Sequence, residues 1–326
     1  MNLKFFNLKV YSDNNFEWNN STLITVGTFD GVHLGHKFVI ETCKSLANEN
    51  NLNFLVYTFY PHPREVLGNK DFKILTTQKE KLYLLEKYGV ENVFIKNFNI
   101  EFSKKSAKDF IVEELIKKFN LKVLVLGYDN QFGKNREGSY EQFIDLAKIH
   151  NFKLYKLEPL YINNIPVSST KIRNAINEGN IELANEMLGY TYFIEGNVVS
   201  GLKIGRQLGF PTANVDVEDF AKLIPPTGVY VVAVAINEKV YKGVLNIGYR
   251  PTLNIPNLPL SIEVHIIDFD EDIYNKIIRI YFFKKIREDI KFPSLQELKY
   301  QIQKDIDFTL CFFSQKPNLI ETKINL

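Results

Sequence analysis

The chain has 326 residues, a length that allows two domains, each with its own hydrophobic core. Hydrophobic residues make up 45% and charged residues 24% of the sequence, as in a soluble globular protein. The formal net charge of +2 is nearly balanced, which argues against bulk binding of nucleic acid or of an anionic membrane. The two cysteines, Cys43 and Cys311, lie too far apart to indicate a disulfide framework or a cysteine metal site.

The beginning of the chain, M-N-L-K-F-F-N-L-K-V, is too broken by charge to be a secretory signal peptide. No apolar run approaches the ~18 residues that a membrane span needs. We therefore expect a cytoplasmic protein without a membrane partner. The sequence shows no sign of an obligatory protein partner, so the expected partners are small molecules.

The first half of the chain alternates strand-like and helix-like segments. Strands are expected at the apolar runs 23–26, 54–59, 93–98, 123–126 and 153–157, and amphipathic helices near 36–49, 77–88, 106–119 and 139–150. This order predicts an α/β domain, a Rossmann-like parallel sheet with helices on both faces. Ligands of such sheets bind beyond the carboxyl ends of the strands.

The loop after the first expected strand reads G-T-F-D-G-V-H-L-G-H and leads into a helix near Gly35. His33 and His36 lie at this helix start, so both imidazoles can face an anion held by the helix N-terminus. Imidazolium donors there would neutralise charge that grows on a transferring phosphoryl group. A histidine pair alone is more often a surface feature, but the preceding strand and the glycines favour a functional pair. No third ligand cluster supports zinc.

Three other segments at the expected ligand edge carry polar residues. Ser169 and Thr170 begin a helix that contains Arg173, either as simple caps or as contacts to a bound triphosphate. Asp129, in the segment G-Y-D, follows another expected strand and would otherwise be a turn residue. The stiff loop Y-P-H-P-R at 60–64 is equally compatible with a proline-rich turn and with a phosphate or substrate contact.

Two short helices are expected between the halves, over 170–177 and 181–188, and each is followed by a glycine. We place the boundary there, with one domain over 1–184 and the other over 185–326. The second half has strands without intervening helices, expected at 192–199, 229–236, 241–247, 261–267 and 276–283. This pattern predicts an all-β antiparallel barrel or sandwich, followed by a C-terminal helix over 294–305 with a serine cap.

The segment V-S-G-L-K-I-G-R-Q-L-G-F-P-T-A-N, at 199–214, combines a glycine-rich loop with a polar tetrad. Small residues such as Gly201 and Gly205 let a backbone close around phosphates. Thr212 and Asn214 would project to the same side of an extended segment, and their hard oxygen donors suit Mg²⁺. A tight hairpin would explain the glycines but not the tetrad.

Glu263 lies in the alternating segment S-I-E-V-H-I-I-D, on the same side as His265. We expect this side to face into a barrel, where an acid is costly unless it has a role or a partner. A phosphate-binding loop, a metal site and a carboxylate base are the parts that a small-molecule kinase needs. Arg287, Lys291 and Phe292 form either a solvated charge run or a flap over a planar ligand.

Together these motifs resemble the bifunctional riboflavin kinase/FMN adenylyltransferases, the prokaryotic FAD synthetases. The resemblance covers roughly residues 20 to 310 and rests on motifs in the order of the family: G-T-F-D-G-V-H-L-G-H, Y-P-H-P, G-Y-D-x-x-F-G, S-S-T-x-x-R, G-R-x-L-G-F-P-T-A-N, N-I-G-Y-R-P-T and E-V-H-I-I-D. It implies an N-terminal nucleotidyltransferase fold and a C-terminal riboflavin-kinase barrel. It also implies two steps: riboflavin and ATP give FMN and ADP, and FMN and ATP then give FAD and pyrophosphate.

For the kinase step, the resemblance implies a base, a metal and a phosphate loop. Glu263 would accept the proton of the riboflavin 5′-hydroxyl, and Thr212 and Asn214 would hold Mg²⁺ on the ATP phosphates. The loop residues expected to bind those phosphates are Gly201, Lys203, Gly205 and Arg206. Arg287 and Phe292 would close over the flavin.

For the adenylyl step, the phosphate of FMN is already a nucleophile, so positioning and electrostatics would suffice. His33, His36 and Arg173 would stabilise the ATP phosphates and the departing pyrophosphate. Further ATP contacts are expected from Gly27, Phe29, Asp30, Gly35, Ser169 and Thr170. Asp129 would hold ribose or flavin, and Asn130 after it departs from the aromatic residue common in the family.

Three alternatives remain open. A decayed first half would leave a riboflavin kinase alone, but the intact histidine pair argues against this. Another adenylyl- or cytidylyltransferase would not need the P-T-A-N half. A flavin-binding regulatory or storage protein would be expected to lack Glu263 or to add a DNA-binding element, and no basic helix-turn-helix stands out.

Overall fold

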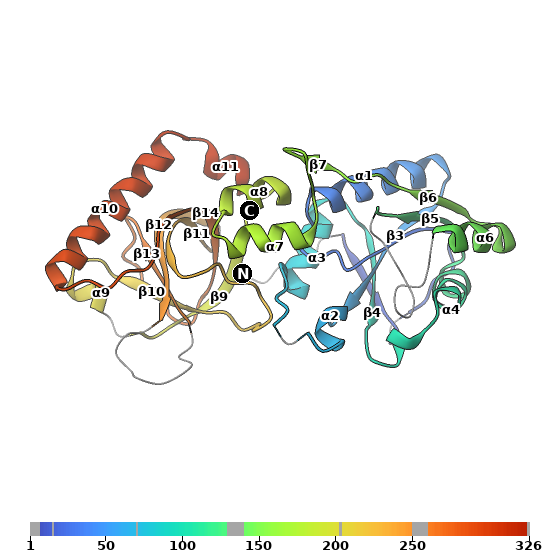
Figure 1. The fold of residues 1–326 in the computed structure, drawn as a ribbon, viewed down its shortest axis with the longest axis horizontal. Coiled ribbons are helices and arrows are strands. Elements are labelled where there is room, and N and C mark those ends of the chain that lie inside the picture. The colour runs from blue at the N-terminus through green and yellow to red at the C-terminus, as the bar shows by residue number, and fades with distance from the viewer. Residues whose placement is uncertain are drawn as a thin grey trace. The chain divides into compact units, whose positions relative to one another are not determined.

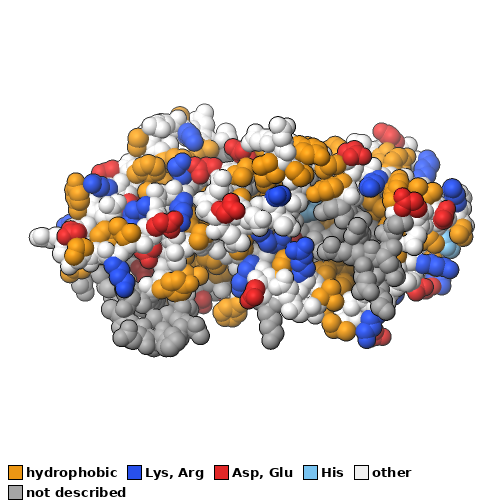
Figure 2. All heavy atoms as spheres, viewed as in Figure 1, with side chains coloured by type: hydrophobic (Ala, Val, Ile, Leu, Met, Phe, Trp, Pro, Cys, Tyr) orange, Lys and Arg blue, Asp and Glu red, His pale blue; other side chains and the backbone are white. Residues whose placement is uncertain are grey.

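The computed structural model describes residues 7–14, 16–69, 71–128, 140–201, 204–249 and 260–324. Contacts within the chain divide it into two compact units, Asn2–Ser169 and Thr170–Leu326, here called the N-terminal and the C-terminal unit (Figure 1). Acidic and basic side chains are interspersed over the face seen in Figure 2, in keeping with the nearly balanced charge. Within the described ranges, no helix combines the length and the apolar character needed to cross a membrane.

The N-terminal unit is built on a parallel sheet with the strand order β1-β4-β3-β2-β5-β6. Its strands are β1 (Lys9–Ser12), β2 (Thr22–Val26), β3 (Asn53–Tyr60), β4 (Asn92–Asn97), β5 (Leu121–Leu126) and β6 (Lys153–Lys156). The five predicted strands are confirmed. The sequence analysis missed β1, which is a half-buried edge strand paired only with β4 and has little apolar signal.

Helices cover both faces of this sheet, as predicted. They are α1 (Leu34–Glu49), α2 (Pro63–Val66), α3 (Gln78–Lys87), η1 (Phe102–Lys104), α4 (Ala107–Asp109), η2 (Phe110–Ile116), α5 (Lys117–Phe119) and α6 (Tyr140–His150), and a short hairpin joins β7 (Tyr161–Ile162) to β8 (Ile165–Pro166). Helix 107–119 and α6 pack on the face that carries Ile24 and Leu55. Thr25 points to the opposite face, toward Cys43 of α1. The predicted helix 106–119 is therefore present, with a π-helical middle in η2.

The strand order places a topological switch point between β2 and β5. From β2 the chain winds outward through β3 and β4 on one side, and it returns through β5 and β6 on the other. Crevices at the carboxyl ends of strands form where the winding direction reverses. The loop that carries the histidine pair follows β2, and the segment that begins with Gly127 follows β5, so both start at this point.

The C-terminal unit is a closed antiparallel barrel with the order β10-β13-β12-β11-β14-β9, which decides between the barrel and the sandwich. Its strands are β9 (Phe193–Val199), β10 (Thr212–Asp216), β11 (Gly228–Ile236), β12 (Lys239–Tyr249), β13 (Leu260–Ile266) and β14 (Ile277–Arg287). Its helices are α7 (Ser169–Asn177), α8 (Ile181–Leu188), α9 (Ile204–Gln207), α10 (Leu295–Ser314) and α11 (Leu319–Lys323). The sequence analysis did not predict β10 as a strand, and it ended α10 nine residues early.

Helix α8 is fastened to strand β14 of the barrel. The side chain of Asn185 donates to the carbonyl of Phe282 (2.8 Å) and accepts from the backbone N–H of Tyr192 (2.7 Å), and Glu182 pairs with Lys284. These contacts explain why the division falls at Ser169, before both short helices. The boundary predicted at 184/185 remains a prediction for the functional domains.

The alternation along the barrel strands corrects one expectation about Glu263. Ile262 and Val264 are buried and pair with the buried Ile247 and Leu245 of β12, so this side of β13 faces the barrel interior. Glu263 lies on the opposite, outer side and is half-buried. Because side chains alternate strictly along a strand, a carboxylate beside inward-facing Ile262 and Val264 must face outward.

Candidate functional site

The loop after β2 brings the two predicted histidines into direct contact. His33 is the N-cap of α1, and its Nδ1 accepts the backbone N–H of His36 (3.4 Å). The two imidazole rings stack with their centroids 3.7 Å apart, and the ring of Phe29 lies 4.9 Å from that of His36. Since Nδ1 of His33 accepts a hydrogen bond, the neutral ring carries its proton on Nε2. The pair therefore forms one compact unit at the start of α1.

The backbone of this loop is strained and is held from a neighbouring segment. Phe29 and Val32 have positive φ values of 48° and 33°, which cost a side-chain-bearing residue roughly 1–3 kcal/mol each. The carboxylate of Asp30 accepts the backbone N–H groups of Leu75 (2.9 Å) and Thr76 (3.0 Å). The hydroxyl of Thr76 accepts the N–H of Gly31 (3.0 Å). Asp30 thus braces the loop, and its predicted contact to ATP stays a prediction.

The structure changes the expected charge of the histidine pair. Burial, together with the positive charges of His33 and Lys81, lowers the pKa of His36 well below its ordinary value. Two stacked imidazolium rings would repel each other in a site of low dielectric. In this environment His36 is therefore a neutral imidazole, not the imidazolium donor that we expected. Among the described residues, its buried Nδ1 has no hydrogen-bond partner.

Three further predicted residues of the N-terminal unit lie at the same loop. The hydroxyl of Ser169, the first residue of α7, donates to the carbonyl of Asp30 (2.9 Å). Gly35 lies close to the pair, since a Cβ there would lie 3.1 Å from the ring of His33. Gly27 donates its N–H to the carbonyl of Tyr57 and continues the sheet. These three residues are brought together with the histidine pair.

For the remaining predicted residues of the adenylyl site, the structure gives the burial of two and does not describe a third. Thr170 is exposed and Arg173 half-buried, and both continue α7 as residues of the C-terminal unit. Asp129 and its neighbour Asn130 lie outside the described residues. In the Y-P-H-P-R loop, His62 caps α2 through Arg64 N–H (3.1 Å) and stacks on Phe72, which supports the structural interpretation of that loop.

In the C-terminal unit, three neighbouring strands align the predicted metal ligands and base. Asn214 of β10 lies directly opposite Glu263 of β13, and Glu263 lies opposite Asn246 of β12. Thr212 lies opposite His265 in the same register. Directly opposed residues share one face of a sheet, with Cβ atoms about 4.5–5.5 Å apart. The carboxylate and its amide and hydroxyl neighbours therefore form one polar row on the outer face of the barrel.

The two loop glycines lie directly against the predicted metal ligands. A Cβ at Gly201 would collide with the side-chain amide of Asn214. A Cβ at Gly205 would collide with the carbonyl of Phe210 and lie 3.4 Å from the hydroxyl of Thr212. At Gly205 the obstacle is a backbone carbonyl, so the close approach favours glycine, whereas a side chain at Gly201 would have to displace the amide of Asn214. Arg206 of the same loop is exposed, and Lys203 lies outside the described residues.

Two residues that the sequence analysis left without a role support this row. The hydroxyl of Ser261 donates to Oε1 of Glu263 (2.8 Å). Nδ1 of His265 lies 2.8 Å from the carbonyl of Pro211, just before Thr212. Asn246 was also missed, although its position in the motif N-I-G-Y-R-P-T could have drawn attention to it. Only the strand register shows that all three belong to the site.

Two of the predicted flavin residues, Arg287 and Phe292, lie together at and just after the end of β14. The guanidinium of Arg287 pairs with the buried carboxylate of Asp305 on α10 (Nη2 to Oδ2, 2.8 Å) and lies 5.6 Å from the ring of Phe292. Asp289 follows closely, and its Oδ2 would lie 2.6 Å from a Cβ at Gly248. Arg287 thus ties this segment to α10, while its contact to flavin stays a prediction.

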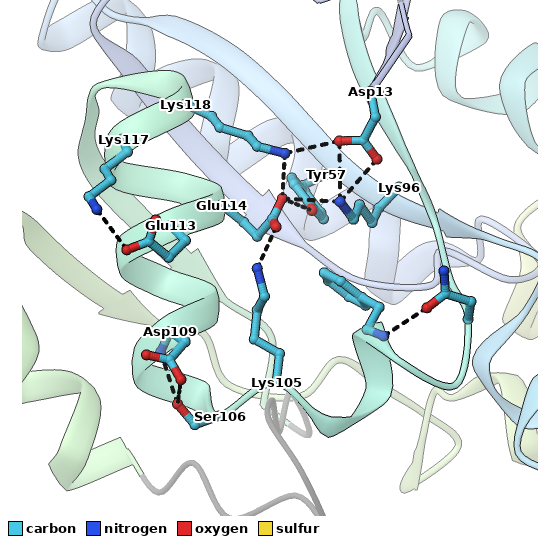
Figure 3. Close-up of polar contacts among 12 residues, drawn as sticks. Asp13, Tyr57, Lys96, Lys105, Ser106, Asp109, Glu113, Glu114, Lys117 and Lys118 are labelled. Atoms are coloured by element: carbon cyan, nitrogen blue, oxygen red, sulfur yellow. Dashed lines mark hydrogen bonds and ion pairs between the residues drawn. The ribbon is translucent and has the colours of Figure 1, made fainter.

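A separate charge cluster lies in the N-terminal unit and is here called the Glu114 cluster (Figure 3). Its members are Asp13, Tyr57, Lys96, Lys105, Glu114 and Lys118. Glu114 is 5% exposed at its side chain and contacts Lys105 (2.6 Å), Lys118 (2.8 Å) and Lys96 (3.4 Å). Burial raises its pKa, but the lysines outweigh burial and lower the pKa to about 2. No motif of the sequence analysis indicated this cluster.

Comparisons with known proteins match both units. The FAD synthetase family model matches residues 16–171, and the riboflavin kinase family model matches residues 188–313. The bifunctional riboflavin kinase/FMN adenylyltransferase of Bacillus subtilis is 40% identical over 90% of this chain and 93% of its own length. The Escherichia coli protein of the same name is 36% identical over 87% of this chain and 90% of its own length.

The chain belongs to the family of bifunctional riboflavin kinase/FMN adenylyltransferases. This confirms the resemblance seen in the motifs, and it includes both halves of the chain. The fold agrees as well. The solved structure of a Streptococcus pneumoniae protein, named there a macrolide-efflux protein, superposes with a TM-score of 0.84 at 29% identity and covers 92% of this chain and 98% of that one.

Proposed function

We propose that the two units divide the two activities of the family between them. The C-terminal unit would phosphorylate riboflavin to FMN, and the N-terminal unit would adenylylate FMN to FAD. The observation that carries the first assignment is the row Asn214, Glu263 and Asn246 beside Gly201. The stacked His33 and His36 at the switch point of the sheet support the second.

In the kinase step, Glu263 accepts the proton of the riboflavin 5′-hydroxyl as its oxygen attacks the γ-phosphorus of ATP. A bond forms between the riboflavin oxygen and the γ-phosphorus, and the bond from the γ-phosphorus to the oxygen that leaves with ADP breaks. The carboxylate of Glu263 takes up the proton. The hydrogen bond from Ser261 orients one carboxylate oxygen and leaves the other to face the hydroxyl. General-base help of this kind contributes about 10²–10⁴-fold.

Thr212 and Asn214 are the residues that fit Mg²⁺. Both offer hard oxygen donors in the same row as the base, and the bare backbone of Gly201 lies against the amide of Asn214. A cation held there would supply charge neutralisation on the ATP phosphates. His265 holds the carbonyl of Pro211 and so positions Thr212.

In the adenylyl step, a phosphate oxygen of FMN attacks the α-phosphorus of ATP, and the bond to pyrophosphate breaks. No protein base is needed because the attacking oxygen is already an anion. His33 and His36 stabilise charge on the phosphates, and the neutral His36 does so as a hydrogen-bond donor. Ser169 is fixed to this loop by its hydrogen bond to the carbonyl of Asp30, and Thr170 and Arg173 are proposed as further phosphate contacts from the motif S-S-T-x-x-R.

The flavin contacts of Asp129, Arg287 and Phe292, the role of Mg²⁺ and a cytoplasmic location complete the proposal. The test is chromatography of flavins during incubation of the full chain with riboflavin, ATP and Mg²⁺. FMN that appears first and FAD that forms later support both assignments. FMN alone contradicts the assignment of the N-terminal unit. Stoichiometric flavin binding without turnover favours the binding-protein alternative.

A further inference from the structure

Lys81, a residue outside every motif used above, lies buried beneath the loop that carries the histidine pair. It belongs to α3 and is 6% exposed. Its ammonium nitrogen lies 3.1 Å from the carbonyl of Phe59, 3.3 Å from the hydroxyl of Thr58 and 3.4 Å from the carbonyl of Thr28. The first two partners lie at the end of β3, and the third lies in the loop after β2. Lys81 therefore ties the carboxyl ends of two neighbouring strands together.

The three contacts around Lys81 use all three N–H groups of its charged form. A backbone carbonyl can only accept, so the bonds to Thr28 and Phe59 each use one N–H of the lysine. The hydroxyl of Thr58 donates to the carbonyl of Thr28 (3.2 Å), so its oxygen accepts the third N–H. A neutral amine has only two N–H groups and a lone pair, so it would have to accept the proton of the Thr58 hydroxyl, which would release that hydroxyl from the carbonyl of Thr28.

The charges that face Lys81 come from separate elements. Burial lowers the pKa of Lys81 to about 8, while the carboxylates of Asp30 and Glu65 act in the opposite direction. Asp30 belongs to the histidine loop, and Glu65 belongs to α2. The charges that lower the pKa of His36 are those of His33 and Lys81, in addition to burial.

The contact with Thr28 acts on the site through Phe29, the next residue of the chain. Phe29 has a φ of 48°, and its ring packs against the imidazole of His36. A strained residue keeps such a conformation only where its surroundings hold it. Asp30 and Thr76 hold the far side of the strained segment, and Lys81 holds the near side.

We propose that Lys81 is a positioning residue of the adenylyl-transfer site. Its ammonium group holds the carbonyl of Thr28 and so orients Phe29 and His36. Its charge also disfavours a second cation at His36. This rests on the proposed role of the histidine pair. It adds a residue outside the histidine motif, whose buried ammonium nitrogen is bound by acceptors of the protein itself. A misplacement of about 1 Å at such a site costs on the order of 10²-fold in rate.

The test compares Lys81→Met, which keeps the length and apolar stem, with Lys87→Met as a matched control. Lys87 is an exposed residue near the end of the same helix. We expect Lys81→Met to slow adenylyl transfer by about 10–100-fold. Riboflavin phosphorylation by the C-terminal unit stays within about twofold in both variants, as an internal measure of enzyme concentration, and circular dichroism of both variants checks that the N-terminal unit is folded. Lys87→Met transfers adenylyl groups at the rate of the wild-type protein.

A second readout separates positioning from stability alone. The chain has 5 histidines, so the imidazole signals can be assigned and titrated by NMR. We expect the pKa of His36 to rise in Lys81→Met. In the wild-type protein, adenylyl transfer falls as the pH rises past about 8, where Lys81 loses its proton, and the variant lacks this alkaline limb.

Unchanged adenylyl transfer in a folded Lys81→Met protein would overturn the inference, as would an unshifted pKa of His36. If the variant does not fold, Thr58→Val removes the hydroxyl between Lys81 and the carbonyl of Thr28 while Lys81 itself is kept. The pH profile is measured on the wild-type protein and needs no variant. A flat profile from about pH 7 to 9.5 overturns the inference. A wild-type protein that makes no FAD refutes the proposed function, whereas the histidine titration still decides the effect of Lys81.

Discussion

Replacement of Glu114 by glutamine tests how much a buried charge cluster stabilises the N-terminal unit. The change keeps the shape of the side chain but removes the charge that Lys96, Lys105 and Lys118 surround. These lysines lower the pKa of Glu114 from 4.5 to about 2. At about 1.4 kcal/mol per pKa unit, this corresponds to roughly 3 kcal/mol at neutral pH.

The sign of the pH dependence comes from the lowered pKa. The unfolded chain binds a proton on Glu114 at a higher pH than the folded protein does, so the stabilisation is complete above about pH 4.5. It is lost as the pH falls toward about 2, where the folded protein also takes up the proton. The difference between the wild-type protein and Glu114→Gln should therefore be largest at neutral pH and shrink in acid.

The assay is thermal unfolding of the full chain, followed by circular dichroism between about pH 3 and 7. For a unit of this size, roughly 3 kcal/mol lowers Tm by about 6–12 °C. Glu113→Gln is the matched control, because Glu113 is the preceding residue and its pair with Lys117 is exposed on both sides (63% and 48%). Exposed pairs contribute about 0–1 kcal/mol. A shift below about 1 °C for Glu114→Gln, or one equal to that of the control, would refute the reasoning.

Three further predictions concern the two proposed sites, and each is read from a flavin time course. Glu263→Gln should slow riboflavin phosphorylation by about 10²–10⁴-fold while added FMN is still converted to FAD, and an intact kinase rate would remove Glu263 as the base. His36→Ala should abolish FAD formation while FMN accumulates, and loss of both products from a folded variant would contradict two independent sites. Gly201→Ala should impair phosphorylation alone, because its Cβ would displace the amide of Asn214, and wild-type activity would show that the loop can move away.

The sequence alone predicted most of the fold, because the periodicity of apolar residues and the glycines that end helices are local properties of the chain. The buried apolar runs predicted five strands of the parallel sheet, and the glycine after Leu188 ends α8 in the left-handed conformation, with φ of 76° at Gly189. The strands missed were β1 and β10. β1 is a half-buried edge strand, and β10 carries the polar Thr212 and Asn214 on its outer face. Their short or polar sequences give no periodic signal, and pairing with distant strands alone makes them strands.

The candidate sites divide in the same way. Motifs named the histidine pair, the glycine loop and Glu263, because chemistry at these positions depends on residue type and close spacing. The side of the barrel that Glu263 faces was wrong in the sequence analysis, since only the burial of Ile262 and Val264 identifies the inner side of β13. The neutral state of His36 was also unexpected, because burial and the charge of Lys81 act across space.

The sequence by itself therefore determined the order of the two folds, the family and the residue types of both sites. Only the tertiary structure decided that Asn246 and Ser261 flank Glu263, that Lys81 lies beneath the histidine loop, and that Glu114 is surrounded by lysines. Motifs are local because they are read along the chain. Strand register, burial and electrostatic fields join residues that are far apart in sequence, so no pattern along the chain contains them.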